Sequence, residues 1–259
     1  MFRTFGAEIW RERSSRMCKI YVVGIGPGAE RQMTILADET LRKCDVIVGY
    51  TVYIDLVKNR YPDKTFLTTP MKQEAARCRM AFEEALKGKK VAMICSGDAG
   101  IYGMAGLMYE VGRDYPEVSL EIIPGITAAS GGAAVLGAPL MHDFAVISLS
   151  DLLTPWEKIE ARLRAAASAD FVICIYNPSS KKRADYLKKA CDCVLEYQSG
   201  DTVCGLVKNI GREGETCRVL PLRELRDTAV DMFTTVYIGN AQTMEIDGRM
   251  VTPRGYRNV

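Results

Sequence analysis

The sequence predicts an α/β fold: two α/β domains whose mainly parallel or mixed sheets flank a ligand cleft. Apolar runs of strand length alternate with helical patterns, as in proteins built on parallel sheets. The run at residues 91–95 has no polar alternation, which is typical of a central strand covered on both faces. Because 259 residues are many for a single domain, we expect two domains.

The loop at residues 24–29 organises the first half of the chain. It follows a short apolar run, residues 20–23, and its glycines expose backbone N–H groups to a ligand. The spacing satisfies G-x-G-x-x-[GA] when Ala29 takes the last place. A dinucleotide site also needs an acid at the end of the second strand, whereas Asp45 precedes that strand and Pro27 removes an N–H group. We therefore expect a glycine-proline ligand loop that does not hold a dinucleotide.

Helices are expected between the strands. Thr34 is placed to cap a helix that runs to Arg42 and turns Leu36, Ala37 and Leu41 inward. Further helices are expected at residues 73–86 and 157–167, with a helix of small residues ending near residue 137.

Each predicted strand breaks off into a turn. The later strands are expected at residues 91–95, 120–123, 144–149, 171–175, 202–207 and 233–238, and their turns begin at residues 96, 124, 150, 176, 208 and 239. In open α/β sheets, ligands bind beyond the carboxyl ends of the strands. We therefore expect all these turns to line one cleft between two sheets.

The expected division of the chain has three parts. Residues 1–17 form an N-terminal extension, because Met17 stands directly before the first strand. Residues 18–138 form the N-terminal α/β domain and residues 139–259 the C-terminal α/β domain. Pro139 marks the boundary, since a proline after a glycine-rich helix end stops the helix and turns the chain.

Composition excludes several classes of protein. Hydrophobic residues make up 48% and charged residues 25%, as in ordinary globular proteins. No apolar run approaches the roughly 20 residues that span a bilayer, and the first residues lack the apolar core of a signal peptide. A net charge of +2 gives no indication of nucleic-acid binding. We expect a cytoplasmic protein with neither membrane nor nucleic-acid partners.

The nine cysteines do not form a disulfide framework. Their number is odd, no C-x-x-C pair occurs, and most lie in apolar runs, so a reducing cytosol is the simpler interpretation. Cys191 and Cys193 could belong to a metal or iron-sulfur site. The ligand set for such a site is incomplete, because His142 is the single histidine and no second close cysteine pair exists. We expect no protein-bound metal.

Three ordered motifs carry a resemblance to a known family. They are residues 24–28 with Thr34, residues 96–98 with Tyr102, and residues 124–128. Together they resemble the signatures of the tetrapyrrole (corrin and porphyrin) methyltransferases, and the resemblance covers nearly everything from residue 18 to residue 240. The stretches 137–144, 148–156 and 176–178 are similar to the precorrin-3B C(17)-methyltransferase branch, including its cobalt-factor III counterpart.

The resemblance implies an activity and its partners. It implies S-adenosylmethionine as methyl donor, a small tetrapyrrole substrate, two α/β domains flanking a trough, and a homodimer. The branch implies methylation at ring carbon 17 with ring contraction in cobalamin biosynthesis. Whether the substrate carries cobalt stays open.

The resemblance also implies a donor site. Its residues are Pro27, Ser96, Gly97, Asp98, Ile101, Tyr102, Thr127, Ala128, Tyr176 and Gly205. A sulfonium donor with an amino-acid carboxylate needs backbone donors and no strong nucleophile near the methyl group. Asp98 could accept from the ribose hydroxyls or the ammonium group, or it could only close its own turn. Thr127 could serve the donor, cap a helix, or do both.

The acceptor and its chemistry suggest further residues. A precorrin presents carboxylates around a flat apolar ring, so cations at strand ends could bind it; they are Lys181, Lys182, Arg183, Lys208 and Arg212. A solvated helix face is the alternative for the first three. Ring contraction must move protons, which requires an acid or base, and His142, Asp151 and Lys208 are comparable candidates.

Two other classes of function stay open at this point. One is a family member with different regiochemistry, or a diphthine-type methyltransferase that acts on a protein; residues 148–156 disfavour it. The other is a metal-binding module in which cysteines hold a cluster and the glycine loops are only tight turns.

Overall fold

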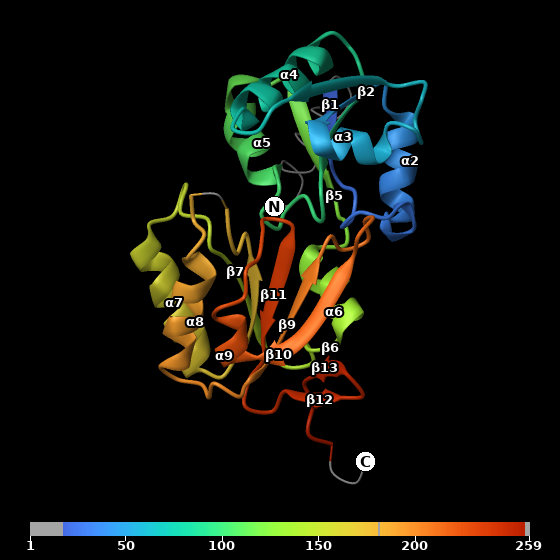
Figure 1. Ribbon diagram of the computed structural model, residues 1–259. Helices are drawn as coiled ribbons and strands as arrows, with labels where there is room; N and C mark the ends of the chain where they lie inside the picture. The colour runs from blue at the N-terminus through green and yellow to red at the C-terminus, as the bar shows by residue number, and fades with distance from the viewer. Residues whose placement is uncertain (1–17, 181, 257–259) are drawn as a thin grey trace, which may run out of the picture. The chain divides into compact units, whose positions relative to one another are not determined.

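The computed structural model describes residues 18–180 and 182–256. The expected N-terminal extension and Lys181 lie outside them. The chain divides into two compact units, Met1–Thr127 and Ala128–Val259 (Figure 1). The division therefore follows residue 127, whereas we expected it after residue 138. The segment between the two positions is helix α6 (Ala128–Leu136), which packs on the sheet of the second unit.

The described part of the first unit is built on one five-stranded sheet, in which all neighbouring strands run parallel. The strand order is β3-β2-β4-β1-β5, with bounds β1 (Cys18–Gly24), β2 (Val46–Tyr50), β3 (Thr65–Thr69), β4 (Val91–Cys95) and β5 (Val118–Ile123). The helices are η1 (Glu30–Gln32), α2 (Ile35–Lys43), α3 (Thr51–Val57), α4 (Glu74–Leu86), α5 (Ala105–Val111) and η2 (Gly112–Asp114). Parallel pairing brings the carboxyl ends of all five strands to one edge.

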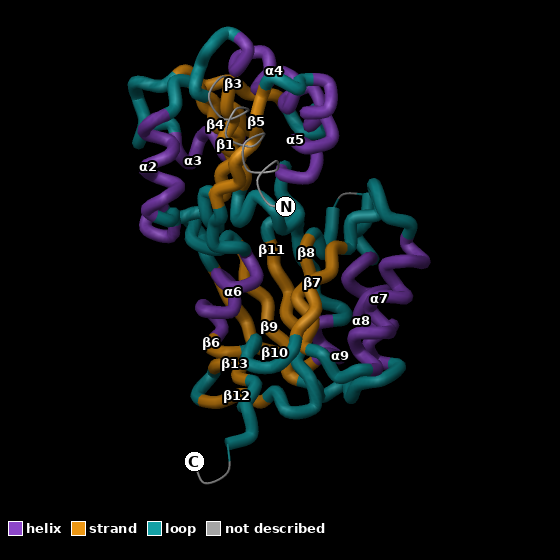
Figure 2. Tube along the Cα trace, turned by 180° about the vertical axis from the view of Figure 1, so that it is seen from behind, coloured by secondary structure: helices purple, strands orange, loops and turns teal. Residues whose placement is uncertain are grey.

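Helices cover both faces of this sheet (Figures 1 and 2). On one face α4 and α5 pack over a core that includes Phe82 and Met108. On the other face α2 and α3 pack over Leu41 and Tyr61. Both faces of the central strand β4 are thus buried, as its unbroken apolar run predicts.

The predicted cap of α2 is confirmed. The Thr34 hydroxyl oxygen accepts a hydrogen bond from the Ala37 N–H at 3.1 Å. Ala37 and Leu41 are buried as expected, but Leu36 is 50% exposed. The prediction for Leu36 is wrong because the inward stripe runs through residues 37, 40 and 41, which are spaced three and four apart.

The second unit has a mixed five-stranded sheet among its described residues. Its order is β10-β9-β11-β8-β7, with bounds β7 (Phe144–Ser148), β8 (Val172–Tyr176), β9 (Val203–Lys208), β10 (Thr216–Pro221) and β11 (Thr234–Ile238). Only β7 and β8 pair in parallel; the other neighbours are antiparallel. The prediction of parallel or mixed sheets is confirmed. A small sheet of β12 (Met244–Ile246), β13 (Arg249–Val251) and β6 (Gly137–Ala138) lies beside it.

Strand direction decides which turns share an edge. Strands β7, β8 and β9 run the same way, so their carboxyl ends lie together, whereas β11 runs against them. The turn after β11 therefore lies at the opposite edge, where the Asn240 side-chain amide donates to the carbonyl of Asp170, just before β8. The expectation that this turn joins the others is wrong.

Helices also cover both faces of the second sheet. Helices α7 (Trp156–Ser168), α8 (Tyr186–Leu195) and α9 (Leu222–Leu225) enclose one core with the sheet, and α6 packs against the other face. Helix α6 approaches the strands closely because its facing residues are small. A Cβ on Gly132 would collide with the Tyr237 hydroxyl, and a Cβ on Gly205 of β9 would lie 2.6 Å from Leu136 Cδ1.

Candidate functional site

Three glycines join the three motif loops at the carboxyl edge of the first sheet. Gly24 ends β1, Gly97 follows β4 and Gly125 follows β5. A Cβ on Gly24 would lie 2.7 Å from both the Gly125 nitrogen and the Gly97 oxygen. A Cβ on Gly125 would lie 2.6 Å from the Gly24 carbonyl carbon. The three loops therefore touch through bare main chain at the carboxyl edge of the first sheet.

Main-chain hydrogen bonds fix the first loop against the second. Gly26 and Gly97 form an antiparallel bridge, with N–H···O distances of 3.1 Å and 2.8 Å. The Ile25 N–H donates to the Cys95 carbonyl at 2.9 Å. Pro27 is buried in the turn that follows. The loop shape is thus set by backbone contacts before any ligand binds.

Asp98 ties the second loop to itself and to the third loop. Its Oδ1 accepts from the N–H groups of Gly100, at 2.7 Å, and Ile101, at 3.1 Å. Its Oδ2 accepts from the Gly125 N–H at 2.9 Å. This geometry matches the turn-closing alternative for Asp98. The bond to Gly125 adds a bridge between loops that local sequence patterns do not reveal.

Gly24, Gly97 and Gly125, where the three loops touch, are called the glycine junction below. The remaining predicted donor residues of the first unit lie close to these glycines in the sequence. Ser96 directly follows β4, and Thr127 directly precedes α6. Ile101 and Tyr102 are 41% and 56% exposed. Tyr102 has a φ of +53°, a conformation that costs a non-glycine residue free energy and is often found at functional sites. Exposed apolar side chains on a rigid loop can form a wall for a ligand.

Tyr176 has a clear structural role in the second unit. It ends β8, and its hydroxyl oxygen accepts from the Ala129 N–H at 2.7 Å, in the first turn of α6. Tyr237 donates its hydroxyl to the carbonyls of Ala128, at 2.8 Å, and Ala129, at 2.9 Å. Burial raises the pKa of Tyr237, so this donor keeps its proton. Two tyrosines therefore hold the start of α6. The Tyr176 hydroxyl supplies the acceptor for the Ala129 N–H, which has no partner within the helix.

Gly205 is accounted for by packing. It is buried, and a Cβ there would meet Leu136 of α6 and the Met250 sulfur at 3.1 Å. Any contact it makes with a ligand must therefore use its backbone.

The three acid-base candidates do not lie together. His142 precedes β7, and its Nε2–H donates to the Pro253 carbonyl at 2.9 Å. Asp151 follows the carboxyl end of β7, and Lys208 is the last residue of β9. Since β7 and β9 run the same way, Asp151 and Lys208 share the carboxyl edge of the second sheet, whereas His142 lies at the amino edge. Five residues of extended strand separate His142 from that edge, about 16 Å.

Asp151 is held as a carboxylate. The Tyr186 hydroxyl donates to its Oδ2 at 2.6 Å, and Arg183 Nη1 lies 3.2 Å from its Oδ1. These partners lower its pKa, the Tyr186 hydrogen bond most. Arg183 also donates to the Ser150 hydroxyl at 2.8 Å. This cluster was missed because Asp151 lies more than thirty residues from both partners, and no local pattern links them.

Lys208 is also paired. Its Nζ lies 2.8 Å from Asp231 Oδ2, and the Thr234 hydroxyl donates to Asp231 Oδ1 at 3.0 Å. Burial alone would raise the pKa of Asp231, but these hydrogen bonds lower it below its usual value. Arg212 lies over the Phe233 ring, at 5.9 Å from its centroid. Of the five predicted cations, Arg183 and Lys208 therefore already have carboxylate partners.

The cysteine pair lies in the apolar core. Cys191 and Cys193 are buried in α8, and burial raises the pKa of Cys191 to about 12. In the described ranges, 18–180 and 182–256, no group of three or more His, Cys, Asp or Glu side chains is arranged to hold a metal ion. Nor does any helix in these ranges have the length and apolar character to cross a membrane.

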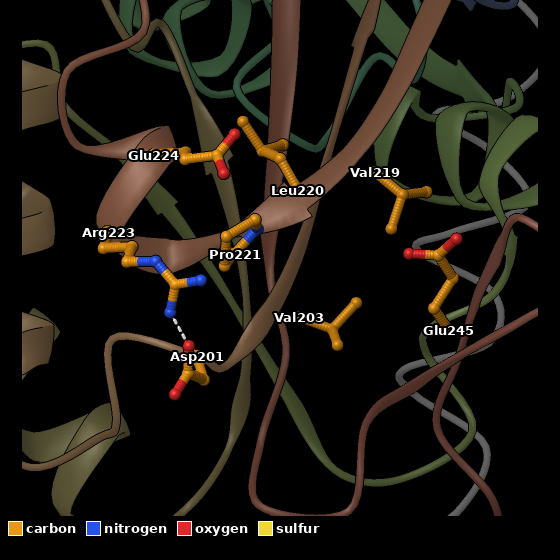
Figure 3. A pocket seen from close by; sticks show the side chains of 8 residues that line it. All are labelled: Asp201, Val203, Val219, Leu220, Pro221, Arg223, Glu224 and Glu245. Carbon is orange, nitrogen blue, oxygen red and sulfur yellow. Dashed lines mark ion pairs between the residues drawn. The ribbon is translucent and has the colours of Figure 1, made fainter.

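A cavity of about 390 Å³ lies elsewhere in the second unit (Figure 3). Its lining residues are Asp201, Val203, Val219, Leu220, Pro221, Arg223, Glu224 and Glu245. It includes the start of β9 and the end of β10, which places it at the amino edge of β9, away from Lys208. Asp201 and Arg223 form an ion pair there.

A family model of tetrapyrrole (corrin/porphyrin) methylases matches residues 19–226. The chain belongs to the tetrapyrrole methylases. This tetrapyrrole methylase is 49% identical over 236 residues to a Salmonella typhimurium protein named "Probable cobalt-factor III C(17)-methyltransferase", covering 91% of this chain and 98% of that protein. It is 39% identical over 246 residues to "Precorrin-3B C(17)-methyltransferase" from Sinorhizobium sp, covering 92% and 96%.

Solved structures agree with this assignment. The crystal structure of the methyltransferase CobJ is similar to this tetrapyrrole methylase with a TM-score of 0.84 and 34% sequence identity. The similarity covers 90% of this chain and 99% of that one. The family predicted from the three motifs and the predicted fold class are confirmed.

Proposed function

We propose that this tetrapyrrole methylase transfers a methyl group from S-adenosylmethionine to ring carbon 17 of a corrin precursor and contracts the macrocycle, in cobalamin biosynthesis. The observation that carries the proposal is the near full-length match to the Salmonella typhimurium protein, at 49% identity over 98% of its length. The substrate is cobalt-factor III or precorrin-3B. The higher identity to the relative named for cobalt-factor III favours the cobalt-bearing substrate, in which the metal belongs to the substrate.

The loops at the carboxyl edge of the first sheet are proposed to hold the methyl donor. They offer main-chain groups fixed by the Gly26–Gly97 bridge, with Pro27, Asp98 and Ile101 around them. A sulfonium donor reacts by in-line displacement, so the protein needs mainly to position it and to keep nucleophiles away. The thiol of Cys95, beside these loops, is buried and its burial raises its pKa to about 12, so it stays protonated. Ser96, Gly97, Tyr102, Thr127, Ala128, Tyr176 and Gly205 stay predicted donor residues.

The acid-base step of contraction is proposed to involve the carboxyl edge of the second sheet. Lys208 lies there with Asp151, whereas His142 lies at the other edge. A carboxyl group whose pKa is lowered is a poor proton donor near neutral pH, so Asp151 is better suited to holding the residues around Ser150. We therefore propose Lys208 as the candidate that contacts the acceptor, and a structural role for His142.

We also propose a cytoplasmic homodimer. The family resemblance supports the dimer. The nine free cysteines support a reducing compartment. Size-exclusion chromatography with light scattering tests the dimer directly.

Separate incubations with cobalt-factor III and with precorrin-3B, each with a methyl-labelled donor, test the function. The expected product gains the mass of one labelled methyl group. A parallel titration with S-adenosylhomocysteine should raise Tm, because a ligand that binds only the folded state stabilises it. Pro27→Ala should weaken this binding, and NAD should not bind. Tight NAD binding, or no mass gain with either corrin precursor, would contradict the proposal.

A further inference from the structure

Arg77 is a buried cation that forms no ion pair with an acidic side chain among residues 18–180 and 182–256. It lies on α4 and is only 4% exposed. Its Nε donates to the Thr69 hydroxyl at 3.0 Å, and its Nη2 donates to the carbonyls of Thr69, at 3.4 Å, and Pro70, at 3.2 Å. Within the described ranges no ion pair joins it to a carboxylate. The nearest acid along the helix, Glu74, instead accepts from the Lys72 N–H at 3.1 Å.

Such a charge is unusual because a buried cation is normally paired. Neutral oxygens accept hydrogen bonds from its Nε and Nη2 but leave its positive charge uncompensated. The charge therefore creates a positive potential at the place where it lies. That place is the carboxyl edge of the first sheet, since Thr69 is the last residue of β3.

The half-buried Tyr50 contacts the Arg77 guanidinium. It is the last residue of β2 and pairs in register with Thr69. The Arg77 guanidinium lies 5.7 Å from the centroid of the Tyr50 ring, in cation–π contact. The ring of Tyr53 packs edge-on against it at 5.4 Å, which fixes its orientation. Tyr50 is half-buried, and no described residue forms a hydrogen bond with its hydroxyl.

A phenol in cation–π contact is a stronger hydrogen-bond donor, because the charge draws electron density from the ring. Its preferred acceptor is an anion, since hydrogen bonds to ionised groups are shorter and stronger. The loop that follows β3 adds Lys72, an exposed second cation. The same sheet edge carries the glycine loops proposed for the methyl donor.

We propose that Tyr50 and Arg77 form a carboxylate subsite, in which Tyr50 donates to the carboxylate and Arg77 acts through Tyr50 as a positioning residue. The inference rests on the proposed function, because the two available carboxylate sources are an acetate or propionate arm of the tetrapyrrole and the amino-acid end of the methyl donor.

The test is Tyr50→Phe, which removes the hydroxyl and keeps the ring over Arg77. Native and variant proteins are titrated with S-adenosylhomocysteine by calorimetry and with cobalt-factor III by absorbance. We expect about tenfold weaker binding of one of the two, from the loss of one charge-assisted hydrogen bond, with Tm unchanged. The ligand that weakens identifies the source of the carboxylate. Tyr109→Phe is the matched control, because Tyr109 is 58% exposed on α5 and should leave both titrations unchanged.

A double-mutant cycle tests the part played by Arg77. Arg77→Lys keeps the charge but removes the guanidinium that contacts Tyr50, and we expect it to weaken binding of the same ligand several-fold. In a Tyr50→Phe background the same change should have less than a twofold effect. Native-like binding of both ligands by Tyr50→Phe overturns the subsite, and additive losses overturn the role of Arg77. A native protein that does not bind cobalt-factor III contradicts the proposed function, and the S-adenosylhomocysteine titration alone then decides the subsite.

Discussion

The glycine junction predicts a severe effect of a single methyl group. In Gly125→Ala the new Cβ would lie 2.6 Å from the carbonyl carbon of Gly24 and would also collide with the carbonyl oxygen of Gly97. Both neighbours are main-chain atoms in loops fixed by the Gly26–Gly97 bridge, so neither can turn aside as a flexible side chain could. Overpacking of this kind costs about 1–3 kcal/mol, and contact with backbone on two sides places this variant toward the upper half of that range.

The assay combines thermal unfolding with a titration of S-adenosylhomocysteine. A loss of about 2–3 kcal/mol lowers Tm by about 4–12 °C in a chain of this size. Because relief of the clash must move the loops apart, the donor analogue should also bind at least tenfold more weakly.

Gly106→Ala is the matched control. Gly106 lies in α5, and a Cβ there would meet nothing within 4 Å. Alanine is the better helix former by about 0.5–1 kcal/mol, so Tm should stay level or rise and binding should not change. A Gly125→Ala protein with native Tm and native affinity would refute the argument that the loops meet through bare backbone.

Three further variants test the second unit. Tyr176→Phe leaves the Ala129 N–H without its acceptor and should lower the free energy of unfolding by about 1–2 kcal/mol in urea titrations; no change would argue against the cap. Because the pKa of Asp151 is lowered in the fold, its stabilisation is complete above the unfolded value of about 3.9 and is lost as pH falls through the lower folded value. The stability deficit of Asp151→Asn should therefore be full at pH 7 and shrink below pH 4, and a deficit independent of pH would contradict this. His142→Gln should keep kcat within about twofold, since His142 lies at the amino edge, whereas a hundredfold loss would restore it as the acid or base.

Local patterns were enough to predict the central strands of both sheets and helices α2, α4, α6 and α7, whereas the edge strands β3 and β10 were not predicted. The cap at Thr34 and the apolar run of β4 depend on neighbours within a few residues, and both were predicted correctly. The meeting of the three motif loops was also predictable, because parallel strands bring their carboxyl ends to one edge.

Strand direction could not be predicted in the same way. Strand β11 is buried along its whole length because helices cover both faces of its sheet. Its residues 236–238 form the kind of apolar run that a parallel central strand also shows, although β11 is antiparallel to both neighbours. An apolar run shows that a strand is covered and says nothing about the direction of the strands beside it.

Long-range polar contacts were equally hidden. The Asp98 bridge to Gly125 and the Asp151 pair with Arg183 each join residues far apart in the sequence. The buried Arg77 looks in the sequence like any basic residue of an amphipathic helix. Only the fold shows that it contacts the Tyr50 ring and that no carboxylate of the described residues pairs with it. The small residues of α6 can be recognised in the sequence, but the sequence does not show which unit they pack against.

The position of the added methyl group tests the central claim most directly. The product formed from cobalt-factor III and a carbon-13 methyl donor would be analysed by nuclear magnetic resonance. We predict one labelled methyl group, attached to ring carbon 17 of a contracted macrocycle. A label on any other ring carbon would contradict the proposed reaction, even if the protein binds both substrates.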